Sequence, residues 1–445
     1  MSRIRLFTRK LSTFQIIIFG FAGVILVGAL LLMLPAASAD GTRVSFSDSL
    51  FTATSAVCVT GLVVRDTAVT WTYFGQAVIL VLIQIGGLGV ISVGILLVMA
   101  SGKKIGLMQR STLQDALSAP QLGGIVKMTG FILKVSLILE FGGAAVMMPA
   151  FCSRFGMKGI WMSVFHSVSA FCNAGFDVMG SETGAFSSLT SFADNPLVVT
   201  VICVLIVVGG IGFLTWDDVR THGFRFRKYR MQSKVILTIT VILIAIPFLL
   251  FFLRDFAGMP AAERVMKSVF QAITPRTAGF NTANLSAMSG AGRAVLVVLM
   301  LIGGAPGSTA GGMKTTTAAV LFANIAAAFN QKKNATYFGR RIEDDVVKKA
   351  STIMTMYLFF SVLGALIISA AEVLPFGECF FETASAIGTV GLSLGMTPSL
   401  GLASRLVLIC LMYFGRVGGL TLLFAAVSKK KKETLICPTE KITVG

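Results

Sequence analysis

Long apolar stretches separated by basic loops make up most of the chain. A helix needs about 20 apolar residues to cross the hydrocarbon core of a membrane. Eight stretches reach that length: residues 14–35, 72–99, 125–151, 196–216, 235–256, 291–327, 349–373 and 402–428. The first is longer than the apolar part of a secretory signal, which has about 7–15 residues. The pattern therefore predicts an all-α integral membrane protein with eight transmembrane helices.

Between the two helices of each successive pair lies a shorter, moderately apolar stretch that ends in a glycine motif. These stretches are residues 46–62, 160–176, 262–280 and 376–392. Each can hold a helix of about 10–14 residues, which at about 1.5 Å per residue cannot cross a core of about 30 Å. Lipid does not accept non-helical backbone, so such a re-entrant loop must be wrapped in protein or line a wet cavity. We therefore predict four helix–pore-loop–helix repeats around a central pore, at residues 14–99, 125–216, 235–327 and 349–428.

The charged residues support this arrangement and set its orientation. Only 13% of residues are charged and 55% are hydrophobic, whereas soluble domains carry about 25% charged residues. The formal net charge is +18, but the basic residues lie between apolar spans, which argues against a nucleic-acid partner. Of 38 Lys and Arg, 25 fall in the arm 1–13, in alternate loops and in the tail 429–445. The positive-inside rule then predicts cytoplasmic termini in the plasma membrane, with membrane lipids beside the basic loops.

Little in the sequence favours an enzyme. The seven cysteines form no C-x-x-C pair, and the two histidines are far apart, so neither a metal cluster nor a nucleophile with its base is expected. We predict no cofactor in this chain. Four charged residues within or beside the spans are expected to form structural pairs: Lys134, Glu140, Glu372 and Glu382.

The four short stretches share one pattern. Each has small or hydroxylated residues, then two further residues, then a glycine and a large apolar residue, and the glycines are 114, 104 and 112 residues apart. Four such copies are improbable by chance. Glycine accepts positive φ, which can direct successive carbonyls toward one axis, and rings of carbonyls bind dehydrated cations. The candidate filter residues are Val59, Thr60, Gly61, Asn173, Ala174, Gly175, Thr277, Ala278, Gly279, Thr389, Val390 and Gly391. The alternative is that these glycines only permit tight turns or close packing.

A second glycine motif lies in the second helix of each repeat, at residues 86–89, 209–212, 303–306 and 415–418. In the first two copies we expect close helix packing. In the third, five glycines and a proline within 303–314 exclude a continuous helix. We interpret this segment as an intramembrane gate, with candidate residues Gly303, Gly304, Gly307, Gly311, Gly312 and Lys314. A phosphate-binding loop is rejected because Lys314 comes one residue too late and no strand precedes it.

In the fourth copy Arg416 replaces a glycine. A charge at membrane depth costs about 2.5–3.5 kcal/mol on insertion scales. We therefore expect Arg416 to face the interior, where it would repel cations or hold the broken segment. The alternative is an arginine that snorkels to the cytoplasmic boundary.

The four glycines, the broken third helix and Arg416 resemble the Ktr/Trk/HKT superfamily of potassium transporters. The phrases QAITPRTAGF at 271–280 and TVGL at 389–392 carry most of this resemblance, which covers about residues 14–428. It implies a Ktr-type membrane subunit that passes K⁺, with 303–314 as gating loop and Arg416 as pore arginine. It further implies a homodimer and a cytosolic nucleotide-binding (RCK-type) ring, so nucleotides would act only through that partner. Plant relatives that favour sodium have serine at the first filter glycine, so Gly61 favours potassium. A sodium-coupled or drug secondary transporter is the alternative, although its repeats are usually inverted.

Overall fold

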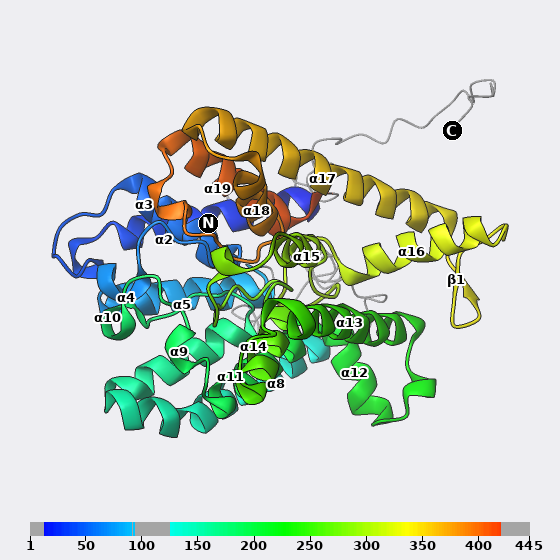
Figure 1. The fold of residues 1–445 in the computed structure, drawn as a ribbon, viewed down its shortest axis with the longest axis horizontal. Coiled ribbons are helices and arrows are strands. Elements are labelled where there is room, and N and C mark those ends of the chain that lie inside the picture. The colour runs from blue at the N-terminus through cyan, green and yellow to red at the C-terminus, as the bar shows by residue number, and fades with distance from the viewer. Residues whose placement is uncertain (1–12, 91, 94–124, 420–445) are drawn as a thin grey trace, which may run out of the picture.

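The computed structural model describes residues 13–90, 92–93 and 125–419. The arm 1–12, parts of the spans 72–99 and 402–428, and the tail 429–445 lie outside these residues. The described chain is a bundle of helices that run mostly along the horizontal direction of Figure 1. Four of its helices are long and apolar enough to cross a membrane, or five if one bent pair counts as a span. The eight predicted spans, one of which was expected to be broken in the third repeat, are therefore not all confirmed within the described residues.

The four long helices open the four predicted repeats. They are α2 (Thr13–Leu32), α8 (Ile125–Phe155), α13 (Met231–Leu250) with the π-turn η4 (Phe251–Asp255), and α17 (Asp344–Glu372). Each is followed by a short helix, which we call a pore helix. The pore helices are α3 (Phe46–Val57), α9 (Lys158–Phe171), α14 (Ala261–Ile273) and α18 (Phe376–Ile387). Short helices therefore lie where the sequence predicts them.

The second helix of each repeat ends inside its glycine motif or, in the third repeat, just before it. These helices are α5 (Tyr73–Leu88), α11 (Pro196–Gly210), α15 (Gly290–Leu301) and α19 (Leu402–Val417). The last glycine of the motif has φ of 86° at Gly89, 91° at Gly212 and 89° at Gly418, a region that L side chains avoid. At Gly212 the chain bends by 96° into α12 (Phe213–His222). The span predicted over 196–216 is therefore broken at residues 211–212.

The expected close packing is present as well, because the first glycine of three motifs faces a pore helix. A β-carbon on Gly86, Gly209 or Gly415 would lie 2.1 Å from the carbonyl oxygen at the end of α3, α9 or α18. The motif thus combines close approach with chain reversal. For the first two copies, the prediction of close packing is incomplete, because the positive φ of Gly89 and of Gly212 also ends the helix.

In the third repeat the helix stops and resumes as predicted. Residues 302–314 are not helical, and α16 (Thr315–Phe329) continues beyond them. A two-residue hairpin follows, formed by β1 (Thr336–Tyr337) and β2 (Arg340–Arg341) with Thr336 opposite Arg341. The remaining short elements are α4 (Thr67–Thr70), α10 (Gly180–Thr183), η1 (Pro35–Ala37), η2 (Thr190–Phe192), η3 (Phe226–Lys228), η5 (Leu285–Ala287) and η6 (Thr397–Ser399).

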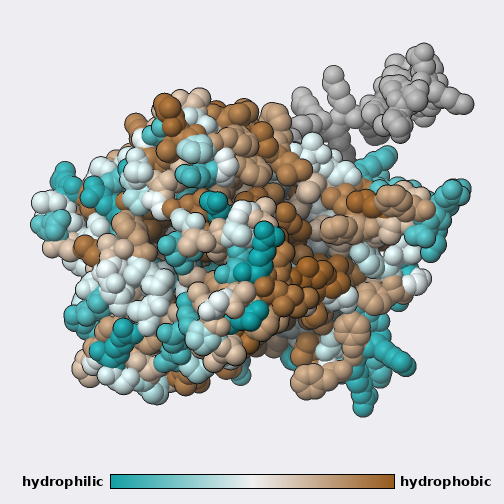
Figure 2. All heavy atoms as spheres, viewed as in Figure 1, coloured by the Kyte–Doolittle hydropathy of each residue, from teal (hydrophilic) through white to brown (hydrophobic). Residues whose placement is uncertain are grey.

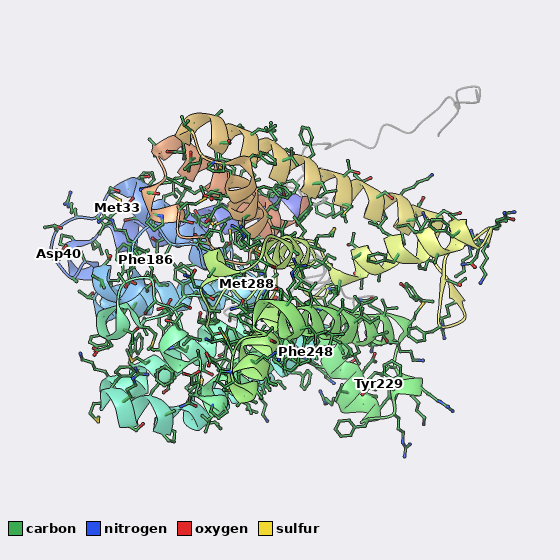
Figure 3. The ribbon with its side chains drawn as sticks, viewed as in Figure 1. Met33, Asp40, Phe186, Tyr229, Phe248 and Met288 are labelled. Carbon is green, nitrogen blue, oxygen red and sulfur yellow. The ribbon has the colours of Figure 1, made fainter. Side chains whose placement is uncertain are left out.

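The surface has an apolar middle and two polar ends. Side chains such as Val241 and Ile246 on α13 and Phe359 on α17 are 59–65% exposed, and Figure 2 shows apolar residues gathered over these helices. Figure 3 places Asp40 at one end of the bundle and Tyr229 at the opposite end. Exposed large apolar patches on this scale fit contact with lipid, as expected for a multi-pass membrane protein.

Candidate functional site

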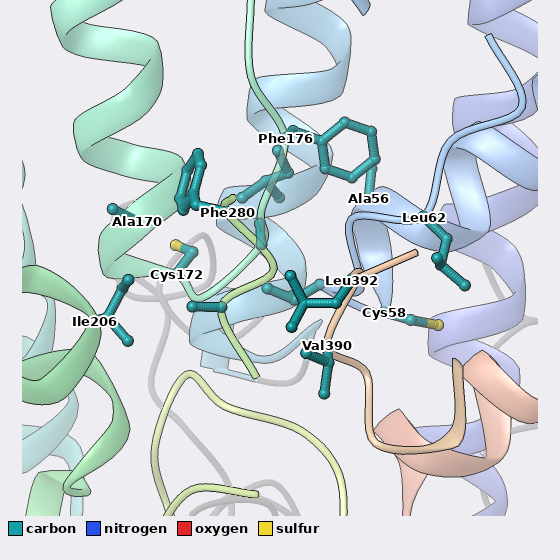
Figure 4. Close-up of a cluster of buried hydrophobic side chains, with 14 of the residues drawn as sticks. Ala56, Cys58, Leu62, Ala170, Cys172, Phe176, Ile206, Phe280, Val390 and Leu392 are labelled. Atoms are coloured by element: carbon teal, nitrogen blue, oxygen red, sulfur yellow. The ribbon is translucent and has the colours of Figure 1, made fainter. Parts of the chain in front are cut away.

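The four loops that follow the pore helices meet at the centre of the bundle, as Figure 4 shows for Leu62, Phe176, Phe280 and Leu392. A β-carbon on each loop glycine would lie 2.1–2.5 Å from a carbonyl oxygen of the next loop. The pairs are Gly61 with Ala174, Gly175 with Ala278, Gly279 with Val390, and Gly391 with Thr60. The fourth loop therefore returns to the first, and the predicted filter residues form one closed ring. No side chain fits at these glycines without moving backbone.

The backbone of the ring is strained in the same way in all four loops. The residue two positions before each glycine has a positive φ: Val59 56°, Asn173 58°, Thr277 72° and Thr389 51°. The residue between it and the glycine does not. Alternation of this kind turns successive carbonyls to the same side of the chain. A positive φ is rare outside glycine and a real outlier for β-branched residues, and such strain collects at functional sites.

A hydroxyl from each pore helix, or from the residue just after it, holds the adjoining loop. Ser55 and Ser385 Oγ accept hydrogen bonds from the amides of Gly61 and Gly391, both at 3.0 Å. In the other two repeats the hydroxyl donates instead to the carbonyl after the glycine: Ser169 to Phe176 at 2.7 Å, and Thr274 to Phe280 at 2.6 Å. These four residues are not among the candidates predicted from the sequence. Their signal is a hydroxyl six residues before the glycine in three loops and five before it in the third.

Two buried polar residues, Glu382 and Gln271, hold the parts of two loops that follow the filter glycine. Glu382 accepts hydrogen bonds from Ser393 Oγ at 2.5 Å, Leu394 N at 3.1 Å and Thr397 Oγ1 at 2.9 Å. Gln271 Nε2 donates to Asn281 Oδ1 at 3.1 Å. Each contacts the residue that lies two positions after a filter glycine. These positions are a consequence of pore-helix packing that the sequence alone does not reveal.

The predicted structural charge pairs are wrong for the three carboxylates. Within the described residues, Glu140, Glu372 and Glu382 bind neutral donors and take part in no ion pair. Glu140 accepts from Gln84 Nε2 at 2.9 Å, and Glu372 accepts from Ser404 Oγ at 2.6 Å. A neutral donor satisfies a buried carboxylate without burying a second charge.

A cavity of about 180 Å³ lies against the ring on the side of the residues that follow the glycines. All four filter glycines line it, together with Asp177, Asn281, Ser393 and residues of the neighbouring loops. The cavity therefore lies directly beside the ring of loops, against the residues that follow the filter glycines.

The segment 302–314 lies against the opposite side of the ring. Thr309 Oγ1 donates to the carbonyl of Phe171 at 3.1 Å and lies 3.1 Å from Asn173 Oδ1. A β-carbon on Gly311 would lie 2.1 Å from Thr389 Oγ1. The segment thus contacts the part of two loops that precedes the glycine, so the ring separates it from the cavity.

The other gate candidates hold the segment against Gly210 and Phe213 of the second repeat and Gly415 of the fourth. Gly312 N donates to Gly415 O at 3.2 Å, and Phe213 N donates to Gly307 O at 2.6 Å. Gly303 N donates to Met313 O at 2.7 Å, which closes the two ends of the segment. A β-carbon on Gly304 would lie 3.0 Å from the carbonyl oxygen of Gly210. The structure therefore brings the predicted gate and filter residues together.

Two cationic side chains, Arg416 and Lys314, bind backbone carbonyls of the segment 302–314. Arg416 Nη1 donates to the carbonyl of Thr309 at 2.5 Å, and Nη2 donates to the carbonyls of Gly86 and Gly87. Lys314 Nζ donates to Ala310 O at 2.8 Å and Gly311 O at 3.3 Å, within its own segment. Arg416 therefore joins repeats one, three and four inside the bundle, which does not fit an arginine that snorkels to the boundary.

A family model described as "Cation transport protein" (TrkH) matches residues 6–435. The chain belongs to this family. The potassium/sodium uptake protein NtpJ of Enterococcus hirae is 40% identical and matches 98% of each chain. The Ktr system potassium uptake protein B of Bacillus subtilis is 37% identical over 97% of this chain and 96% of its own.

The fold has a solved counterpart. The potassium transporter TrkH from Vibrio parahaemolyticus superposes with a TM-score of 0.74 at 21% identity, over 92% of this chain and 84% of that one. At that identity the likeness concerns the fold. Together with the exposed apolar helices, it identifies this TrkH-family chain as a multi-pass membrane protein.

Proposed function

We propose that this TrkH-family protein is the membrane subunit of a potassium uptake system and conducts K⁺ through the ring of four loops. The closed ring of strained loops is the observation that carries the proposal. A turn needs only its glycine, whereas positive φ at valine and threonine has an energetic penalty of about 1–3 kcal/mol per residue. The three such penalties, at Val59, Thr277 and Thr389, are explained if the carbonyls they orient bind an ion.

The proposed K⁺ ligands are backbone carbonyls of the twelve filter residues, from Val59–Gly61, Asn173–Gly175, Thr277–Gly279 and Thr389–Gly391. Within these triplets no side chain is acidic, so selectivity would come from the carbonyl cage and not from a ring of charge. The driving force would be the membrane potential, which contributes about 2.3 kcal/mol per charge per 100 mV.

The proposed gate is the segment 303–314 with Arg416. Its non-helical backbone and its glycines allow it to change shape, and it lies directly against the filter loops. Arg416 and Lys314 add positive charge on that side, which opposes the passage of a cation. Opening would require the segment to leave its bonds to Arg416 and Gly415.

The proposed assembly is a homodimer with one pore in each protomer, controlled by a cytosolic nucleotide-binding ring. Its support is the relative named as part of a Ktr system and the basic loop of α12–η3 at one end of the bundle. Both termini would lie at that end, in the cytoplasm. Copurification of a ring-forming regulator with the full chain, sized by light scattering, tests the proposal.

A secondary transporter remains the rival, and the order of the loops argues against it. Repeats that follow one another around a ring in sequence order differ from the inverted pairs of most secondary transporters. The relative NtpJ is named for potassium and sodium, so both ions belong in the test.

The deciding experiment measures K⁺ and Na⁺ influx in cells that lack their own potassium uptake and coexpress a cognate regulatory ring. Gly61→Ser and Gly391→Ser should lower K⁺ influx and its preference over Na⁺, because each side chain meets a carbonyl at 2.5 or 2.2 Å. Gly41→Ser is the matched control, since Gly41 also has positive φ (65°) but no neighbour within 4 Å. Selectivity unchanged in the two filter variants would favour the secondary transporter.

A further inference from the structure

The outer cavity contains one residue from each repeat at the same position. Val63, Asp177, Asn281 and Ser393 each lie two residues after a filter glycine, and all four line the cavity. Three of them are uncharged. Asp177 is the one ionisable side chain among the described residues that line this cavity.

The carboxylate of Asp177 has bonding capacity left. Its Oδ1 accepts a hydrogen bond from Met179 N at 3.0 Å. Among the described residues, its second oxygen has no hydrogen-bond partner, and the side chain is half-buried at the cavity wall. Of the described Lys and Arg residues, none lines the cavity to neutralise it.

A second buried carboxylate in the same region already has its oxygens hydrogen-bonded to backbone amides. Asp66 is buried, its Oδ1 accepts from Ala68 N and Val69 N, and its Oδ2 accepts from Phe186 N at 2.7 Å. It therefore joins the outer loops of repeats one and two. Asp66 adds negative potential beside Asp177 but offers no free oxygen to the cavity.

We propose that Asp177 is an external cation-binding group, which attracts K⁺ into the outer cavity before the ion reaches the carbonyl ring. This inference rests on the proposed function. A single charge in a concave site focuses potential and raises the local concentration of cations. The ion keeps part of its water shell in the cavity, and the free carboxylate oxygen replaces one water before the carbonyls replace the rest.

A structural role makes a different prediction. The bond between Oδ1 and Met179 N shapes the turn after the filter, and asparagine preserves that acceptor. Asp177→Asn therefore removes the charge and keeps the turn. If the turn alone matters, this variant behaves like the native protein.

Because the four repeats place equivalent residues around the cavity, a carboxylate removed from one repeat can be supplied by another. Asn281 occupies the equivalent position in repeat three, and its Oδ1 accepts from Gln271 Nε2 and Ala283 N. An aspartate there keeps both acceptor bonds. The double variant Asp177→Asn/Asn281→Asp thus returns one carboxylate to the cavity from the adjoining repeat.

The experiment measures K⁺ influx against external K⁺ with the regulatory ring present, at low ionic strength and with added impermeant salt. At low ionic strength Asp177→Asn should raise the half-saturating K⁺ about fivefold and leave the maximal rate unchanged. Added salt should bring native and variant together, because it screens the charge. The double variant should recover the native half-saturation.

Other outcomes overturn the inference. Half-saturation that is unchanged in Asp177→Asn, or that the double variant does not restore, means that the carboxylate does not act through its charge. A lower maximal rate with native half-saturation assigns Asp177 to the architecture of the filter. If the native protein itself transports no K⁺, the proposed function fails, and this result is distinct from the others.

Discussion

At the residue scale, one ionisation sets the charge of the outer cavity. Burial, and next the negative charge of Asp66, raise the pKa of Asp177 from 3.8 to about 7. The carboxylate is thus charged above that pH and loses its charge as the external pH falls through about 7.

We therefore expect the half-saturating K⁺ to rise when the external pH falls from about 8 to about 6, with the steepest change near the pKa of Asp177. Asp177→Asn should show a flat profile at the acid value. The measurement is K⁺ influx at fixed membrane potential over this pH range. Equal pH profiles in the two proteins would assign the dependence to another group.

Glycine spacing and the hydroxyl positions differ in how well they can be predicted. Gly61, Gly175, Gly279 and Gly391 repeat at near-equal intervals, so they stand out in the sequence. Ser55 and its three counterparts do not, because serine and threonine are common in helices and one counterpart is shifted by a residue. Their role depends on a hydrogen bond that exists once the loop folds back on its pore helix.

At the element scale, the segment 302–314 is held by one side chain from another repeat. Arg416 donates to Thr309 O from one arm of its guanidinium and to the end of α5 from the other. A hydrogen bond from a charged donor contributes about 1.5–3 kcal/mol, and 1.4 kcal/mol is tenfold in population. Loss of this link should favour the displaced, open segment.

Arg416→Gln is therefore expected to raise K⁺ influx about tenfold in the absence of the regulatory ring. Arg416→Lys keeps the charge but cannot reach both partners, so it separates the link from electrostatic repulsion. Influx raised in both variants indicates the link, and influx raised in the glutamine variant alone indicates repulsion. Native influx in both would exclude Arg416 from the gate.

The ends of the second helices were only partly predictable. Five glycines and a proline identify the break after α15, whereas α11 carries a run that is apolar except for Thr200 as far as Gly209. Hydropathy does not distinguish a glycine that packs from one that adopts positive φ. The close approach of Gly209 to Phe171 O and the bend at Gly212 arise when α11 meets the pore helix α9.

At the scale of the whole molecule, a charge cluster joins the first repeat to the last. Asp48 on α3 binds Arg65 at 2.8 Å and Arg405 of α19 at 2.6 Å. The Asp48 side chain is 7% exposed, whereas those of Arg65 and Arg405 are 53% and 21% exposed. The cluster thus joins the first and last repeats, which are farthest apart in the sequence, and completes the ring of repeats.

Asp48→Asn should lower the free energy of unfolding by about 1–3 kcal/mol, between the values for surface and buried pairs. The apparent melting temperature in detergent should fall accordingly. Glu182→Gln is the control, because its pair with Lys158 is largely exposed and lies within one repeat. Equal shifts in the two variants would show that the Asp48 cluster does not stabilise the closed ring.

Hydropathy, loop charge and glycine spacing were sufficient to predict a helical membrane protein with four repeats, each with a short helix and a candidate filter loop. Those features are local, because each follows from the residues of one segment and their solvent. The closed ring of glycines, the alternating strain, the breaks at Gly89 and Gly212 and the inward link of Arg416 required the folded chain. The ring and the Arg416 link depend on contacts between repeats about 100 residues apart or more, whereas the helix breaks depend on contact with the pore helix of the same repeat. No local pattern encodes either kind of contact.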